Sequence, residues 1–195
     1  TSNLSPAERI RYMAKLAAVG NIIDFGVGSE FDLEKTLKET FEKGFAIDNS
    51  DRFYQEIRSG ESFLLISDNA GEIVFDRFLL DEISRMGKRV IVSVKSRGIL
   101  NDATREDALM AGIKEPIEIV ETGSGSLGII FDECSDEFKR VFESVDVVLS
   151  KGQANYETLD EVDRRIFYIL RAKCPIVASR MNVPTGSSVF LWNGK

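Results

Sequence analysis

The chain has 195 residues, of which 43% are hydrophobic and 29% are charged, with a formal net charge of -7 and no histidine. This length and hydrophobic content fit about one globular domain, with a core large enough to fold without disulfide bonds or a structural metal ion. The absence of histidine excludes Ser-His-Asp and Cys-His catalysis, HExxH zinc sites and any imidazole acid or base. Chemistry must therefore come from carboxylates, lysines, hydroxyls, backbone amides or a metal ion held by oxygen.

Charge and apolar pattern also limit the partners that we expect. An acidic chain is unlike a nucleic-acid binder, whose surface is basic, and no apolar run of 18 residues predicts a membrane span. Residues 1–13 lack the apolar core of a signal peptide. Cys134 and Cys174 form no metal-type pair, so we expect two buried thiols and a reducing, cytoplasmic location. Because Thr1 stands where a methionine would begin a gene product, we expect a fragment or a processed form.

The first sixty residues predict a helical N-terminal part. Ser5 and Pro6 form a typical helix start, a capping serine followed by proline at the first helical position. Three helices are expected, each with polar residues at its start and a glycine at its end. They cover residues 5–20, 32–44 and 49–60.

Residues 61–195 predict an α/β catalytic domain. Short apolar runs rich in β-branched residues predict strands at 63–66, 89–94, 117–120, 145–149, 175–178 and 188–192. Apolar residues at helical spacing predict helices at 71–86 and 156–172; the first would bury Phe75, Phe78, Leu79, Ile83 and Met86. Near-continuous apolar strands separated by helices indicate a parallel sheet covered on both faces. The sequence therefore predicts a three-layer, Rossmann-like, doubly wound and mostly parallel sheet.

Oxygen-bearing side chains follow the first two predicted strands. Ligands of such sheets bind beyond the carboxyl ends of the strands. Asp68 and Asn69 follow the first strand, and Asp102 lies after the second. These oxygens suit a hard divalent cation such as Mg²⁺ or Mn²⁺. Alternatively, Asp68 or Asn69 caps the next helix, and Asp102 closes the turn before a capping box at Thr104 and Asp107.

Two further features at the same edge favour an anion. Gly71 would let a ligand approach the backbone, and the helix that it opens would offer free N–H groups. Lys151, after the fourth strand, would add a mobile positive charge, although a lysine taken alone is most often a solvated surface residue. A metal ion beside an anion site is typical of phosphoryl chemistry.

A glycine-rich segment follows the third predicted strand. Gly123, Gly125 and Gly128 match the dinucleotide pattern GxGxxG, but residues 129–133 do not begin a helix well. We interpret the segment as a flexible loop over the crevice. An S-adenosylmethionine-dependent methyltransferase that uses this loop is kept as an alternative.

Four segments together, at residues 20–26, 67–72, 100–104 and 151–157, resemble the metal-dependent damage-control phosphatases, long called domain of unknown function 89. The resemblance implies a Rossmann-like α/β/α core with a helical N-terminal part. It also implies hydrolysis of small phosphorylated metabolites, often sugar phosphates or damaged cofactor precursors, with Mn²⁺, Co²⁺, Ni²⁺ or Mg²⁺. The prokaryotic and archaeal branch usually has a CxxC pair near its N-terminus; this chain lacks it, which fits a missing first part.

By position, the family's metal ligands match Asp68, Asn69 and Asp102, and its phosphate-binding lysine matches Lys151. These four form the expected catalytic group. Matching segments and the end of the second strand supply the expected substrate-binding residues, namely Asn21, Asp24, Gly71, Glu72, Lys95 and Asn155. Whether water attacks phosphorus directly or Asp68 is the nucleophile stays open. A non-catalytic module that binds phosphorylated metabolites is the remaining alternative.

Overall fold

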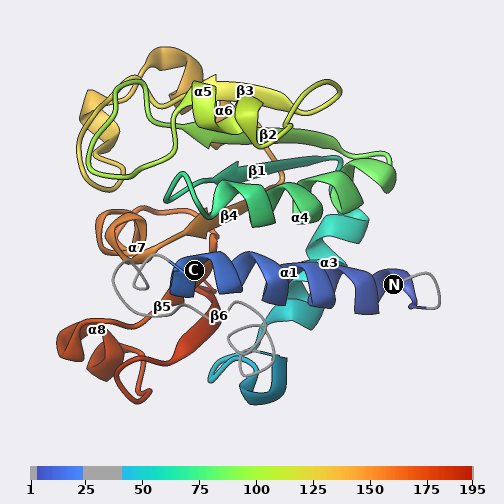
Figure 1. Ribbon diagram of the computed structural model, residues 1–195, viewed down its shortest axis with the longest axis vertical. Coiled ribbons are helices and arrows are strands. Elements are labelled where there is room, and N and C mark those ends of the chain that lie inside the picture. Colours follow the sequence, from blue (N-terminus) through green and yellow to red (C-terminus); the bar gives the residue numbers. More distant parts are fainter. Residues whose placement is uncertain (1–3, 24–40, 195) are drawn as a thin grey trace.

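Figure 1 shows the computed structural model of the chain, which describes residues 4–23 and 41–194. Within these residues the strands are β1 (Ser62–Ile66), β2 (Arg89–Val94), β3 (Glu118–Glu121), β4 (Val147–Lys151), β5 (Phe167–Arg171) and β6 (Ser188–Trp192). They form one sheet in the order β3-β2-β1-β4-β5-β6. Neighbouring strands run parallel, except that β6 is antiparallel to β5. The predicted mostly parallel, doubly wound sheet is confirmed.

Helices cover both faces of this sheet. The described helices are α1 (Pro6–Ile23), α3 (Ser50–Ser59), α4 (Ile73–Arg85), α5 (Arg105–Met110), α6 (Asp136–Ser144), α7 (Gln153–Leu159) and α8 (Pro175–Arg180). Strand side chains alternate between the faces, as the period of two requires. Phe63 and Leu65 pack with α1, α3 and α4, whereas Leu64 and Ile66 pack with α6, α7 and α8. One hydrophobic core therefore lies on each face of the sheet.

The first helix begins as predicted but runs past its expected end. Glu8 accepts hydrogen bonds from the backbone N–H and hydroxyl of Ser5, which closes the first turn. The helix continues to Ile23, so the predicted end at Gly20 is wrong. Gly20 serves a close contact instead, because a Cβ atom there would lie 2.9 Å from the Cα atom of Glu72. This glycine lets α1 pack against the segment that leads into α4.

Two predicted elements after β4 are wrong. The helix expected at 156–172 ends at Leu159, and its second half is β5. The strand expected at 175–178 is helix α8, with Pro175 in its first turn. The cause is ambiguity of period, because the short apolar run at 166–170 fits a helix stripe and a buried strand equally well.

The N-terminal helices share a core with the sheet. Ile10 of α1 and Phe53 of α3 are fully buried in the cluster that contains β1 and α4. The helix predicted at 49–60 is confirmed as α3, whereas the one at 32–44 lies outside the described residues except for a helical turn at 41–43. The proposed boundary at residue 60 stays a prediction.

Two further expectations concern the thiols and the membrane. Both cysteines are free; Cys134 is buried as expected, but Cys174 is only partly buried. In the described part of the chain, each helix is too short or too polar to cross a membrane.

Candidate active site

The loops that follow the parallel strands gather at one edge of the sheet, on the left of Figure 1. The loops after β1 and β2 pair with each other there. The backbone N–H of Ala70 donates to the carbonyl of Asn101, and that of Ala103 donates to the carbonyl of Asp68, each at 2.8 Å. This short antiparallel bridge sets Asn69 opposite Asp102. It brings together the three residues expected as metal ligands, whose role as ligands stays a prediction.

Asp68 is partly buried and lies against the backbone at the end of β4. Gly152 has a φ of 84°, and a Cβ atom there would overlap the Asp68 carboxylate. Burial first, then the negative charges of Glu72 and Asp102, raise the pKa of Asp68 to about 8, against the opposing charges of Lys151 and Lys173. Burial and the neighbouring acids therefore disfavour the charged form of this carboxylate, which a bound cation would stabilise.

Asn69 is buried, and its amide is oriented by neighbouring acids. Nδ2 donates to Glu72 Oε1 at 2.8 Å and to Asp68 Oδ2 at 3.4 Å. The amide oxygen is then the atom that remains for a cation. Among the described residues, no group of three or more His, Cys, Asp or Glu side chains is arranged to hold a metal ion. A set of two carboxylates and one amide oxygen still fits a hard divalent ion that keeps several waters.

Lys151 is a fully buried residue of β4, so the prediction that it adds a mobile positive charge is wrong. Its Nζ donates to Ala17 O at 3.0 Å, Glu72 Oε2 at 2.9 Å and Asp76 Oδ1 at 2.7 Å. Burial alone would lower the pKa of Lys151, but the two carboxylates outweigh it and raise the pKa. All three donors of the ammonium are used inside the protein.

Sequence reasoning missed Asp76, the second acid beside Lys151. Burial raises the pKa of Asp76 to about 6, against the lowering effect of Lys151. The inward stripe of α4 is turned relative to the predicted one, and Phe78 is 39% exposed. It consists of Ile73, Asp76, Leu79, Leu80, Glu82 and Ile83. The period of two in β4 could have revealed the pair, because Lys151 shares a face with Val147 and Leu149.

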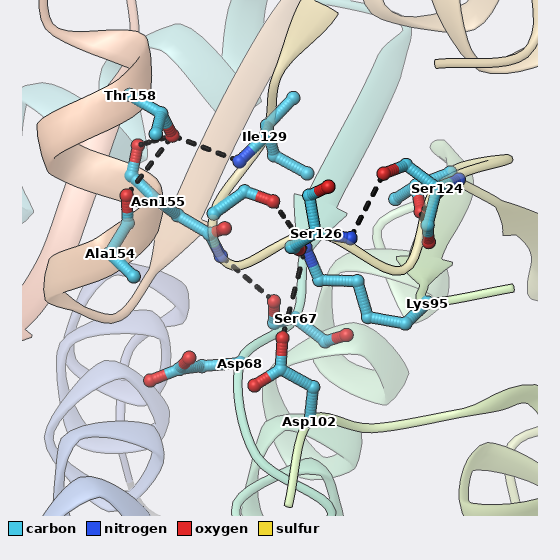
Figure 2. Close-up of polar contacts among 12 residues, drawn as sticks. Ser67, Asp68, Lys95, Asp102, Ser124, Ser126, Ile129, Ala154, Asn155 and Thr158 are labelled. Carbon is cyan, nitrogen blue, oxygen red and sulfur yellow. Dashed lines mark hydrogen bonds and ion pairs between the residues drawn. The ribbon is translucent and has the colours of Figure 1, made fainter. Parts of the chain in front are cut away.

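The expected substrate-binding residues lie in different settings. Gly71 is exposed, with open space where a Cβ atom would stand. Helix α4 begins after it, and the Asn69 carbonyl already accepts from the N–H groups of Glu72 and Ile73. Asn155 is buried and donates to Ser67 O at 3.0 Å (Figure 2) and to Lys151 O at 2.7 Å, which joins the ends of β1 and β4. The Asn21 side chain and Asp24 lie outside the described residues.

Lys95 lies beside Asp102. Its Nζ is 3.7 Å from Asp102 Oδ2, and both side chains are less than a tenth exposed. Burial lowers the pKa of Lys95, and Asp102 partly offsets this effect. The capping box expected after Asp102, formed by Thr104 and Asp107, is confirmed.

The glycine-rich segment is a loop, and only a short 3-10 turn at Phe131–Glu133 follows it before α6. Hydrogen bonds hold it at several points. The N–H of Ser126 donates to Ser124 Oγ at 3.0 Å, and that of Ile129 donates to Thr158 Oγ1 at 2.9 Å (Figure 2). Because no helix begins at the loop, the dinucleotide interpretation of GxGxxG gains no support.

Lys173 is a second residue that sequence reasoning missed. It follows β5, and its charge lowers the pKa of Asp68, although burial and Glu72 dominate that shift. Its backbone N–H donates to Gln153 Oε1 at 2.9 Å, which ties the loop after β5 to the start of α7. Assigning residues 156–172 to one helix concealed that a strand ends beside this lysine.

The chain matches the family described as "Damage-control phosphatase ARMT1-like domain" over residues 1–189. It belongs to this family. The predicted resemblance to damage-control phosphatases is therefore confirmed.

Two relatives of this chain bear the name damage-control phosphatase. The chain is 40% identical, over 92% of its length, to a damage-control phosphatase of Pyrococcus horikoshii and 37% identical, over 89%, to one of Archaeoglobus fulgidus. It spans 63% and 62% of those two proteins. A crystal structure of a DUF89 family protein from Pyrococcus horikoshii superposes with a TM-score of 0.86 at 37% identity, over 94% of this chain and 66% of that one.

Proposed function

We propose that this chain carries the site of a metal-dependent phosphatase that hydrolyses small phosphorylated metabolites, such as sugar phosphates or damaged cofactor precursors. One observation carries the proposal. In a chain of the damage-control phosphatase family, Asp68, Asn69 and Asp102 lie on the paired loops that follow β1 and β2. That edge is where α/β sheets bind their ligands.

Asp68, Asn69 and Asp102 would hold the metal ion. Bound there, Mn²⁺, Co²⁺, Ni²⁺ or Mg²⁺ supplies Lewis acidity toward a phosphate oxygen. The carboxylates of Asp68 and Asp102 supply the negative charge that binds the ion, and Glu72 fixes the Asn69 amide through its hydrogen bond. Gly152 leaves room for Asp68 to approach the backbone.

The phosphate group needs positive charge from another part of the chain than Lys151. Lys173 is the better candidate, because it lies near Asp68 and is only partly buried. Lys151, with its donors used by Ala17, Glu72 and Asp76, acts on the site indirectly. By holding Glu72, it keeps the Asn69 amide in place.

A panel of phosphate esters tested with and without Mn²⁺, Co²⁺, Ni²⁺ and Mg²⁺ examines the proposal. We expect phosphate release that requires a metal ion and falls by about 100-fold or more in Asp68→Asn and Asp102→Asn, since each change removes a charged ligand. Asp136→Asn, an exposed acid at the start of α6, is the matched control and should keep full activity.

The alternatives have distinct outcomes. Release of no phosphate with any metal ion, or full activity in both site variants, would contradict the proposal. Tight binding of a phosphorylated metabolite without turnover would favour a binding module. Calorimetric binding of S-adenosylmethionine would favour the methyltransferase.

A further inference from the structure

Lys95 stands between the expected metal ligand Asp102 and the glycine-rich loop. It follows β2 directly and is 4% exposed. Its Nζ donates to the backbone carbonyl of Ser126 at 2.8 Å and to that of Gly128. The third neighbour is Asp102, whose Oδ2 lies 3.7 Å away. Figure 2 shows the lysine side chain reaching from its own strand to this junction.

These contacts favour a structural role for Lys95 over the expected role in substrate binding. An ammonium has three donors, and two of them point at carbonyls of one loop while the third faces Asp102. A buried lysine is tolerated only where such partners compensate its lost hydration. The Lys95 ammonium therefore joins two segments of the protein, the glycine-rich loop and the loop that carries Asp102.

Other contacts also hold the loop that Lys95 binds. Gly128 has a φ of 70°, and a Cβ atom there would lie 2.6 Å from both Ala154 O and Thr158 Oγ1 of α7. Glu133 accepts hydrogen bonds from the hydroxyls of Ser124 and Ser126. The loop is thus fixed to α7 at one end and to its own continuation at the other, and Lys95 supplies the link to Asp102.

A polar cavity of about 450 Å³ borders the same loop, lined among others by Arg97, Ser124, Ser126 and Glu133. Ser126 belongs both to this cavity and to the contact with Lys95. Movement of the loop relative to Asp102 would therefore move the cavity wall relative to the metal-binding oxygens.

We propose that Lys95 is a positioning residue, whose ammonium fixes the loop at residues 124–128 against Asp102 and so sets the place of the polar cavity relative to the reacting phosphate. This inference rests on the proposed function, because it takes Asp102 as a ligand of the reaction centre.

The test compares Lys95→Met and Lys95→Arg with Lys88→Met. Lys88 is a matched control at the opposite end of β2; its side chain is 12% exposed, and its Nζ donates to Arg58 O at 3.3 Å. Hydrogen exchange of residues 123–130 is measured without metal or substrate. Steady-state kinetics use 4-nitrophenyl phosphate at saturating Mn²⁺.

We expect Lys95→Met to speed exchange of residues 123–130 by about tenfold, since a charge-assisted contact is lost, and to raise KM by about tenfold with kcat changed by less than about threefold. Lys95→Arg keeps the charge and several donors, so its exchange should lie between those of the wild type and Lys95→Met, and it decides the question if Lys95→Met does not fold. Lys88→Met should match the wild type in both readouts.

Two results would overturn the inference. One is loop exchange in the Lys95 variants equal to that of Lys88→Met. The other is a loss confined to kcat, which would mean that Lys95 contacts the reacting group. If the wild type hydrolyses no ester with any metal ion while loop exchange still responds to Lys95, the proposed function fails and the structural link of Lys95 to the loop stands.

Discussion

At the scale of single residues, a substitution of the fully buried Lys151 distinguishes a structural role of this lysine from direct binding of phosphate. We expect Lys151→Met to lower the free energy of unfolding by about 3–5 kcal/mol, because it leaves Glu72 and Asp76 buried without their counter-ion. Urea denaturation measures the effect. Lys173→Met, which changes a partly buried lysine at the same edge, is the control and should raise KM with a much smaller loss of stability. A Lys151 variant as stable as the wild type, with only KM changed, would contradict the buried ion pairs.

Gly152 tests whether the position of Asp68 matters. Any side chain at this φ of 84° is strained, and its Cβ atom would overlap the Asp68 carboxylate. We expect Gly152→Ala to displace Asp68 and to reduce metal-dependent phosphatase activity by about 100-fold. Gly87→Ala, between α4 and β2, has a similar strain at a φ of 80° but meets no atom within 4 Å, which makes it the paired control measured in the same assay. Equal activities of the two variants would argue against Asp68 at the reaction centre.

At the scale of elements, the sequence predicted those with one clear period. β2 has the predicted bounds, and α3, β6 and the capping box of α5 were also found. The prediction for residues 156–178 was wrong because the local pattern does not show whether an apolar run packs as a helix or pairs as a strand. For β5, pairing with β4 and β6 decides that it is a strand. For the same reason the ion pairs of Lys151 were not predicted. The sequence places this lysine at the end of a strand, but it does not show which helix residues pack over it.

Asp146 joins two elements at the opposite end of the sheet and gives a pH-dependent prediction. Its Oδ2 accepts from the N–H groups of Glu61 and Ser62 and from the Ser62 hydroxyl, at 2.8–2.9 Å. The hydrogen bonds from Glu61 and Ser62 hold the pKa of Asp146 below its usual value. A lowered folded-state pKa stabilises the fold above the unfolded pKa of about 3.9, and this stabilisation is lost as the pH falls through the folded value.

We therefore expect Asp146→Asn to cost about 1 kcal/mol at pH 7, a modest value because the carboxylate is exposed. The difference from the wild type should shrink as the pH falls below about 4. Urea denaturation across pH 3–7 measures it, with Asp132→Asn, exposed in the 3-10 turn, as the control. A stability difference that does not change with pH would show that the carboxylate charge contributes nothing.

At the scale of the whole molecule, charge is distributed unevenly around the candidate site. In a chain with a net charge of -7, a phosphate-binding crevice would need positive charge concentrated there. Lysines do follow or end three strands, but Lys95 and Lys151 are paired with acids. Four acids share this edge with the three lysines, Lys173 included; they are Asp68, Glu72, Asp76 and Asp102. Positive charge is therefore not concentrated at this edge, and its acids are available to a divalent cation that would displace the proton of Asp68.

We expect divalent metal ions to bind these acids and to stabilise the whole fold without any substrate. An ion that binds only the folded state, present at 100 times its Kd, adds about 2.7 kcal/mol, which raises Tm by several degrees for a chain of this size. Thermal unfolding with Mn²⁺ or Mg²⁺, and again after addition of a chelator, measures the shift. Asp68→Asn and Asp102→Asn should abolish it, whereas Asp136→Asn should retain it. A shift of equal size in all three variants would place the ion elsewhere on this acidic chain, and the acids at the carboxyl edge of the sheet would then serve only to balance their lysines.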